Sequence, residues 1–282
     1  MHLGSYNPAK KHYDTFRDLT PEEVEQHKAY LPCLCEARER LSLFRMLDRN
    51  YAEWKGYLNR LLSKDFREDV DVSEELNRLL LNYLTFAYTI QEHFAVSFRQ
   101  RFKKQPQTLK KYTDFLDRLC QACWPFAFIL DYRGYVQHVG LGVTSNNRTS
   151  SDTSVRIRVT ANPKTLLAES RQWSRSQLSN KKRPLDLIAI LKEFHVQMLQ
   201  SYAVFVAKTF FPELQPADEF YTRLVNEVHA RHPNARMLFF PRKPKVTPKE
   251  GGKQAIRFNV VMVPNDVFGE LGIKVDQSSA AA

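Results

Sequence analysis

The chain has 282 residues, of which 43% are hydrophobic and 26% are charged, and its formal net charge is +11. This composition is typical of a soluble globular protein and excludes a disordered chain. The longest apolar run is far shorter than the ~20 residues that cross a bilayer, and the first residues lack the apolar core of a signal peptide. We therefore expect a cytoplasmic protein with no membrane partner.

Four cysteines fall in two close pairs: Cys33 with Cys35, and Cys120 with Cys123. Structural disulfides are rare in the cytoplasm, and the single residue between Cys33 and Cys35 does not match the usual spacing of zinc ligands. Both pairs lie in apolar, helical surroundings, where cysteine serves as a small buried hydrophobe. We expect neither a metal nor another cofactor.

The first part of the chain predicts a polar arm followed by helices. Residues 1–19 are polar and are expected to be loosely ordered. The sequence of residues 20–23, Thr-Pro-Glu-Glu, is a capping box that begins a helix. Pro32 is expected to end or kink that helix. Apolar residues at helical spacing then predict a second helix over 33–64.

Three further helices are predicted before the chain changes character. The third extends from Ser73, its expected cap, to about residue 104, and the fourth covers about 108–122. Pro125 opens the fifth helix, whose apolar run over residues 124–130 must be buried. This fifth helix also carries the most informative pair of polar residues in the chain.

A β-hairpin insertion is expected near residues 139–160. Val155, Ile157 and Val159 alternate with Arg156 and Arg158, which predicts a half-buried strand with a basic outer face. Residues 139–144 are expected to pair with this strand across a polar loop over 145–153.

The rest of the chain predicts more helices and a small β structure. Helices are expected near 163–170, over 184–211 and over 216–232. Strands follow at 237–240 and 256–263, on either side of a basic loop. The overall expectation is a mostly α-helical bundle over residues 1–232 and a small basic β appendage over 233–282.

Positive charge is concentrated in two runs. Residues 231–257 contain eight lysines and arginines and one acid, and residues 99–111 contain six with no acid. Such runs are either solvated surface or a binding surface for a polyanion, among which nucleic acid is favoured. The residues that we expect to contact nucleic acid are Arg156, Arg158, Arg242, Lys243 and Lys245.

Arg133 and His138 lie on the continuation of the buried fifth helix. Histidine can act as a general acid or base because its unperturbed pKa of ~6.5 lies near neutral pH. Arginine can bind a phosphate and stabilise charge that develops on it. Five residues separate them by roughly 140° around an ideal helix. A shared site therefore needs the reach of arginine, a distorted helix end or a second subunit. Alternatively, Arg133 pairs with a nearby acid and His138 caps the helix.

The sequence around this pair, Asp-Tyr-Arg-Gly-Tyr-Val-Gln-His-Val-Gly over residues 131–140, resembles the Arg-x4-His motif of the HEPN superfamily. The resemblance covers mainly residues 73–140. It implies a four- or five-helix bundle, usually a homodimer, in which two motifs meet across the dimer and cleave RNA without a metal. Arg133 would then stabilise the phosphate, and His138 would assist attack by the ribose 2′-hydroxyl to leave a cyclic phosphate.

This resemblance implies a bacterial defence or toxin component that has RNA as its substrate and a protein partner or antitoxin. The family usually has Asn, Asp or His after the arginine, where this chain has Gly134. Two alternatives stay open: a catalytically silent module that binds nucleic acid or protein, and a structural protein. His195, on an apolar helical stripe, is expected to be a core histidine with satisfied hydrogen bonds.

Overall fold

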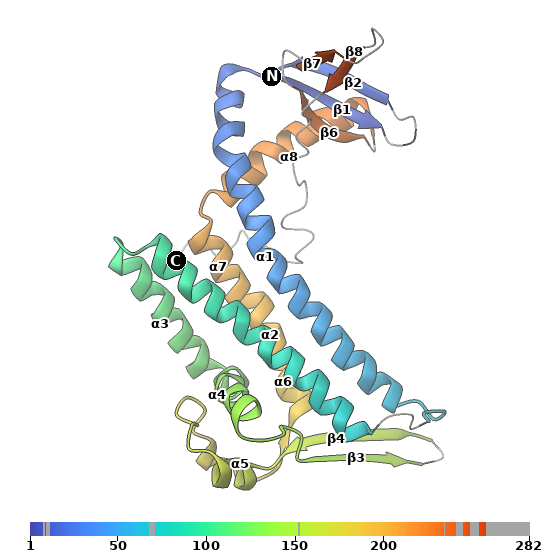
Figure 1. The fold of residues 1–282 in the computed structure, drawn as a ribbon, viewed down its shortest axis with the longest axis vertical. Coiled ribbons are helices and arrows are strands. Elements are labelled where there is room, and N and C mark those ends of the chain that lie inside the picture. The colour runs from blue at the N-terminus through green and yellow to red at the C-terminus, as the bar shows by residue number, and fades with distance from the viewer. Residues whose placement is uncertain are drawn as a thin grey trace. The chain divides into compact units, whose positions relative to one another are not determined.

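The computed structural model describes residues 1–7, 9, 12–67, 71–151, 153–233, 235–240, 245–248 and 254–257. The chain is mostly helical with small antiparallel sheets, which confirms the predicted fold class (Figure 1). Its contacts divide it into two compact units, residues 42–206 and residues 1–41 together with 207–282. We describe each unit separately.

Long helices form most of the unit of residues 42–206. They include the second part of α1 (Pro21–Leu61), α2 (Val72–Arg101), α3 (Pro106–Ala122), α4 (Trp124–His138) and α6 (Leu187–Gln197). Helix α4 packs against α2, α3 and α6. Phe126, Phe128 and Tyr132 of α4 are fully buried, as the apolar run predicts. Burial of α4 on several sides explains why its sequence is apolar all round.

A β-hairpin adjoins these helices beside the end of α1 and the start of α2 (Figure 1). It consists of β3 (Ser145–Ser150) and β4 (Val155–Ala161), and β4 also pairs with the short β5 (Leu185–Asp186). The predicted insertion is present, but its first strand covers residues expected to form a loop. Strand β3 has almost only exposed polar side chains, so backbone pairing forms it without any apolar alternation.

The segment 139–144, expected to be a strand, instead packs closely on α4 and α2. A Cβ on Gly142 would lie 2.6 Å from the Tyr132 hydroxyl and 2.7 Å from Leu80 Cδ2. The backbone N–H of Val143 donates to Asn77 Oδ1 at 2.9 Å. Glycine is required here because only a residue without a side chain allows this approach.

Three helix boundaries differ from expectation. Helix α1 continues through Pro32, since burial of Leu34, Ala37 and Leu41 offsets the hydrogen bond that proline removes. Asp71, not Ser73, caps α2 by accepting from the backbone N–H groups of residues 73 and 74. The helix expected over 184–211 is divided into α6, a π-helical segment (Met198–Tyr202) and α7 (Ala203–Phe210).

Shorter helices complete the unit that contains α4. They are α5 (Pro163–Glu169), close to its predicted bounds, and the 3₁₀ turn Leu178–Asn180. Asn162 caps α5 by accepting from Lys164 N at 3.0 Å.

The other unit contains α8 (Leu214–Arg231), the first part of α1 and a three-stranded sheet of order β2-β1-β6. Strands β1 (His2–Asn7) and β2 (His12–Asp18) lie in the residues predicted to be a loose arm. Strand β6 (Arg236–Phe240) pairs with β1, so the predicted boundary near residue 232 separates two paired strands. The complete burial of Leu3 explains why this polar-looking segment is ordered.

Arg17 of β2 joins this sheet to both helices of the unit. Its guanidinium donates to Glu23 of α1 at 2.6 Å and to Glu227 of α8 at 2.8 Å. These hydrogen bonds from Arg17 lower the pKa of Glu23 to about 2. Beyond β6 the chain forms the pair β7 (Lys245–Pro248) and β8 (Gln254–Arg257).

Candidate nucleic-acid interface

Asp131 begins the polar part of α4 and fixes a segment that lies about 45 residues later in the chain. Its Oδ2 accepts from Ser176 N at 2.9 Å, Ser176 Oγ at 2.9 Å and Arg175 N at 3.1 Å. One carboxylate oxygen therefore satisfies two backbone donors of a turn that would otherwise be unpaired. The local role of Asp131 is positional.

The two tyrosines of the motif belong to the packing of α4. Tyr132 and Tyr135 both lie against Trp173, with ring centroids 6.4 and 5.8 Å from that side chain. The Tyr135 hydroxyl donates to Glu169. Burial and this carboxylate raise the pKa of Tyr135 to about 12. The two rings and the Tyr135 hydroxyl thus hold α4 and its surroundings together, whereas the buried Tyr132 hydroxyl has no hydrogen-bond partner among the described residues.

Arg133 is half-buried and stacks on an aromatic ring. Its Cζ lies 3.5 Å from the centroid of the Tyr88 ring on α2, a cation–π contact. No carboxylate of the described residues pairs with Arg133, and its buried Nε has no hydrogen-bond partner there. The expected alternative, an ion pair between Arg133 and a nearby acid, is therefore absent from the described residues. The cation is positioned but not neutralised.

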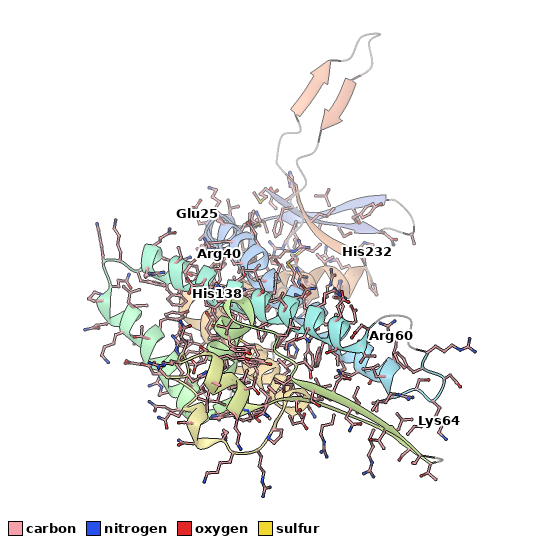
Figure 2. The ribbon with its side chains drawn as sticks, turned by 60° about the horizontal axis from the view of Figure 1, so that its bottom comes forward. Glu25, Arg40, Arg60, Lys64, His138 and His232 are labelled. Carbon is pink, nitrogen blue, oxygen red and sulfur yellow. The ribbon has the colours of Figure 1, made fainter. Side chains whose placement is uncertain are left out.

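His138 is the exposed last residue of α4 (Figure 2). It lines an open groove of about 650 Å³ together with Asn82, Thr85 and Gln137. Gln137 Nε2 donates to Thr85 Oγ1 at 3.0 Å, which fixes the neighbouring wall. An imidazole placed in this way is accessible to a ligand.

One chain does not unite the two motif residues. His138 lines the groove beside Thr85, whereas Arg133 is not among the residues that line it and stacks on Tyr88. The separation follows from the helix, since a five-residue step turns by roughly 140° and rises by roughly 7.5 Å.

The basic hairpin residues lie as predicted on one face of β4. Arg156 and Arg158 are exposed and stand opposite Thr149 and Asn147 of β3. Arg148 lies on the other face and donates to the carbonyl oxygens of Leu61 and Ser63, both at 2.8 Å. The exposed face therefore offers two guanidinium groups, while the opposite face joins the hairpin to α1.

The predicted contacts near the C-terminus are described only in part. Lys245 lies in β7, and the structure describes its backbone. Arg242 and Lys243 lie outside the described residues.

Sequence reasoning missed a third basic segment, residues 171–183. Five exposed cations lie in it without any acid: Arg171, Arg175, Lys181, Lys182 and Arg183. The charges are spread over thirteen residues with no helical or strand period, and no pattern of secondary structure marked them. A count of charge in a sliding window would have found them.

His195 confirms the prediction of a core histidine with satisfied hydrogen bonds. Its Nε2 donates to Asp48 Oδ1 at 3.0 Å, and its Nδ1 accepts from the Tyr83 hydroxyl at 3.2 Å. The imidazole stacks on the Tyr51 ring with centroids 4.0 Å apart. Burial lowers the pKa of His195.

None of the four cysteines, all within the described residues, forms a disulfide. Within the described ranges, no group of three or more His, Cys, Asp or Glu side chains is arranged to hold a metal ion. No helix in the described part of the chain combines the length and apolar character that a membrane crossing requires. Comparisons with protein-family models, with curated proteins and with solved structures gave no significant match.

Proposed function

We propose that the protein binds RNA and cleaves it without a metal ion, at a site that two copies of the chain complete. The observation that carries this proposal is the state of the two motif residues. His138 is exposed in an open groove, and Arg133 is held by Tyr88 with no carboxylate among the described residues to neutralise it. Both groups are thus available to a phosphodiester.

In this mechanism His138 accepts the proton of a ribose 2′-hydroxyl as its oxygen attacks the adjacent phosphorus. The 5′-oxygen leaves with a proton from an acid or from water, and a 2′,3′-cyclic phosphate remains. Arg133 of the facing copy stabilises the negative charge that develops on the phosphate oxygens. A nuclease that needs no cofactor has to be restrained in the cell, which favours a toxin or defence role with a neutralising protein partner.

The test is incubation of the protein with labelled RNA in the presence of a chelator. Wild type is expected to release fragments with cyclic phosphate ends, whereas His138→Ala and Arg133→Ala are expected to be inactive. His93→Ala, which changes another exposed histidine, serves as the control and keeps activity. Cleavage that persists in His138→Ala would exclude the proposal.

Mixing the two inactive variants tests the two-copy site directly. A heterodimer of His138→Ala with Arg133→Ala contains one intact pair, so activity is expected to return on mixing. A site built within one chain would gain nothing from mixing.

The second candidate is a silent module that binds RNA without cleaving it. It is favoured by Gly134, which departs from the family motif, and by the separation of Arg133 from the groove of His138. Binding that weakens steeply with salt, with no fragments from wild type, would select this candidate.

A further inference from the structure

We infer that residues 171–183 bind the phosphates of single-stranded RNA, and that the cavity beside Arg175 accepts one unpaired base. This inference rests on the proposed function in that it takes RNA as the ligand. It concerns a surface distinct from the groove of His138, so it can fail or succeed independently of cleavage.

The first argument is charge. The five cations of this segment, Arg171, Arg175, Lys181, Lys182 and Arg183, are all exposed, and none pairs with a carboxylate of the described residues. Lys181 Nζ lies 4.2 Å from the centroid of the Trp124 ring, which places an aromatic surface beside the cations. The Trp124 ring is half-buried, and unpaired cations beside an accessible part of an aromatic ring form a combination that binds single strands.

The second argument is that the segment is fixed although it forms little regular structure. Trp173 is buried, and its Nε1 donates to Ser170 O at 3.0 Å. Trp124 Nε1 donates to the carbonyl oxygen of Ser176 at 2.7 Å, and the N–H of the same residue donates to Asp131. Fixing the backbone in advance removes much of the ordering cost that a flexible basic loop would incur on binding.

The third argument is backbone strain. Gln177 has φ 47°, the one positive φ among the described non-glycine residues. A non-glycine residue in this region is strained and persists only where its surroundings impose the conformation. It lies within the basic segment, two residues after Arg175. The strained turn holds like charges together, which favours a ligand of opposite charge.

The cavity next to Arg175 has a volume of about 490 Å³. Tyr88 and Tyr112 provide aromatic surface, and Gln91 and Gln121 provide amide groups. Glu92 and Asp117 also line the cavity, and a carboxylate can accept a hydrogen bond from the amino group of a base. A cavity of this size and lining suits a planar ring with hydrogen-bonding edges. A base in a duplex cannot reach it without unpairing, so single strands are preferred.

The test measures fluorescence anisotropy of labelled RNA in chelator, with His138→Ala as the background so that the RNA stays intact. The first variant carries Lys181→Ala, Lys182→Ala and Arg183→Ala. Its charge-matched control carries Arg38→Ala, Arg49→Ala and Lys55→Ala, three exposed residues of α1 that lie outside the basic segments. The segment variant should bind single-stranded RNA at least about tenfold more weakly, with a salt slope shallower by about 2, because three phosphate contacts are lost.

Equal losses in the segment variant and its control would overturn the inference, because they would show attraction to net charge alone. Equal affinity of the parent for a single strand and for a duplex of the same length would also overturn it.

The cavity is tested separately with Thr113→Trp, which places a large ring at its lining, and with Ala95→Phe as a second variant. Thermal unfolding identifies the variant that remains folded. Single-strand binding is expected to weaken severalfold while duplex binding is unchanged. If a folded variant binds single strands as tightly as the parent, the cavity does not accept a base. Loss of cleavage in wild type would instead contradict only the proposed function.

Discussion

The Arg133 guanidinium lies over the Tyr88 ring, with Cζ 3.5 Å from the ring centroid. Stacking uses the face of the guanidinium and leaves its edges, where the donors are, for other partners. Tyr88 also lines the cavity beside Arg175. The Tyr88 ring thus positions Arg133 and also forms part of the lining of this cavity.

The stacking predicts an energetic coupling between these residues. In a double-mutant cycle of Arg133→Ala and Tyr88→Leu, the coupling in free energy of unfolding is expected to be about 0.5–2 kcal/mol. Urea unfolding measures it. Tyr88→Phe keeps the ring and should retain most of the coupling, whereas strictly additive single and double variants would show that the contact contributes nothing.

Two glycines of the motif region should respond in opposite ways to alanine. A Cβ on Gly134 meets nothing closer than Gln172 Oε1 at 3.6 Å, so Gly134→Ala should stabilise α4 by about 0.5–1 kcal/mol. A Cβ on Gly142 would lie within 3.0 Å of three atoms, so Gly142→Ala should destabilise by about 1–3 kcal/mol. Thermal melts compare the pair, and a loss of stability in Gly134→Ala would contradict the packing described for α4.

We expect Asp131 to stabilise the protein by accepting hydrogen bonds from the turn at residues 175–176. Asp131→Ala leaves the N–H groups of Arg175 and Ser176 without their acceptor, which should cost about 1.5–3 kcal/mol. Asp131→Asn keeps an accepting oxygen and should cost less. Hydrogen exchange of the Ser176 amide provides a local readout, and protection that is unchanged in Asp131→Ala would refute this role.

Acid should destabilise the protein in two separate pH windows. Burial lowers the pKa of His27 and His195 from the ordinary 6.5, so below that pH the unfolded chain binds more protons and stability falls. The hydrogen bond from Arg17 lowers the pKa of Glu23 from 4.5 to about 2. That contribution is complete above pH 4.5 and is lost as the pH falls towards 2.

Urea unfolding between pH 7.5 and 5 isolates the histidine window. His195→Gln should reduce the pH slope there, while Glu23→Gln should leave that slope unchanged and alter the profile at lower pH. If the pH slope of His195→Gln equals that of wild type, His195 binds the same number of protons in the folded and unfolded states, and the prediction is wrong.

Helix α2 could be predicted from its apolar periodicity, and α4 from Pro125 and its apolar run, because both signals are local. Strand β3 could not, since its exposed polar side chains have no alternation and pairing with β4 alone forms it. The exposure of His138 followed from its place at a helix end. The stacking of Arg133 on Tyr88 and the fixing of residues 171–183 by Asp131 depend on contacts between distant residues, which periodicity does not encode.

Arg148 connects two elements that are 87 residues apart in the chain, since it closes the carbonyl end of α1 through Leu61. During synthesis, the Leu61 carbonyl therefore cannot obtain this partner until Arg148 of β3 has been added to the chain.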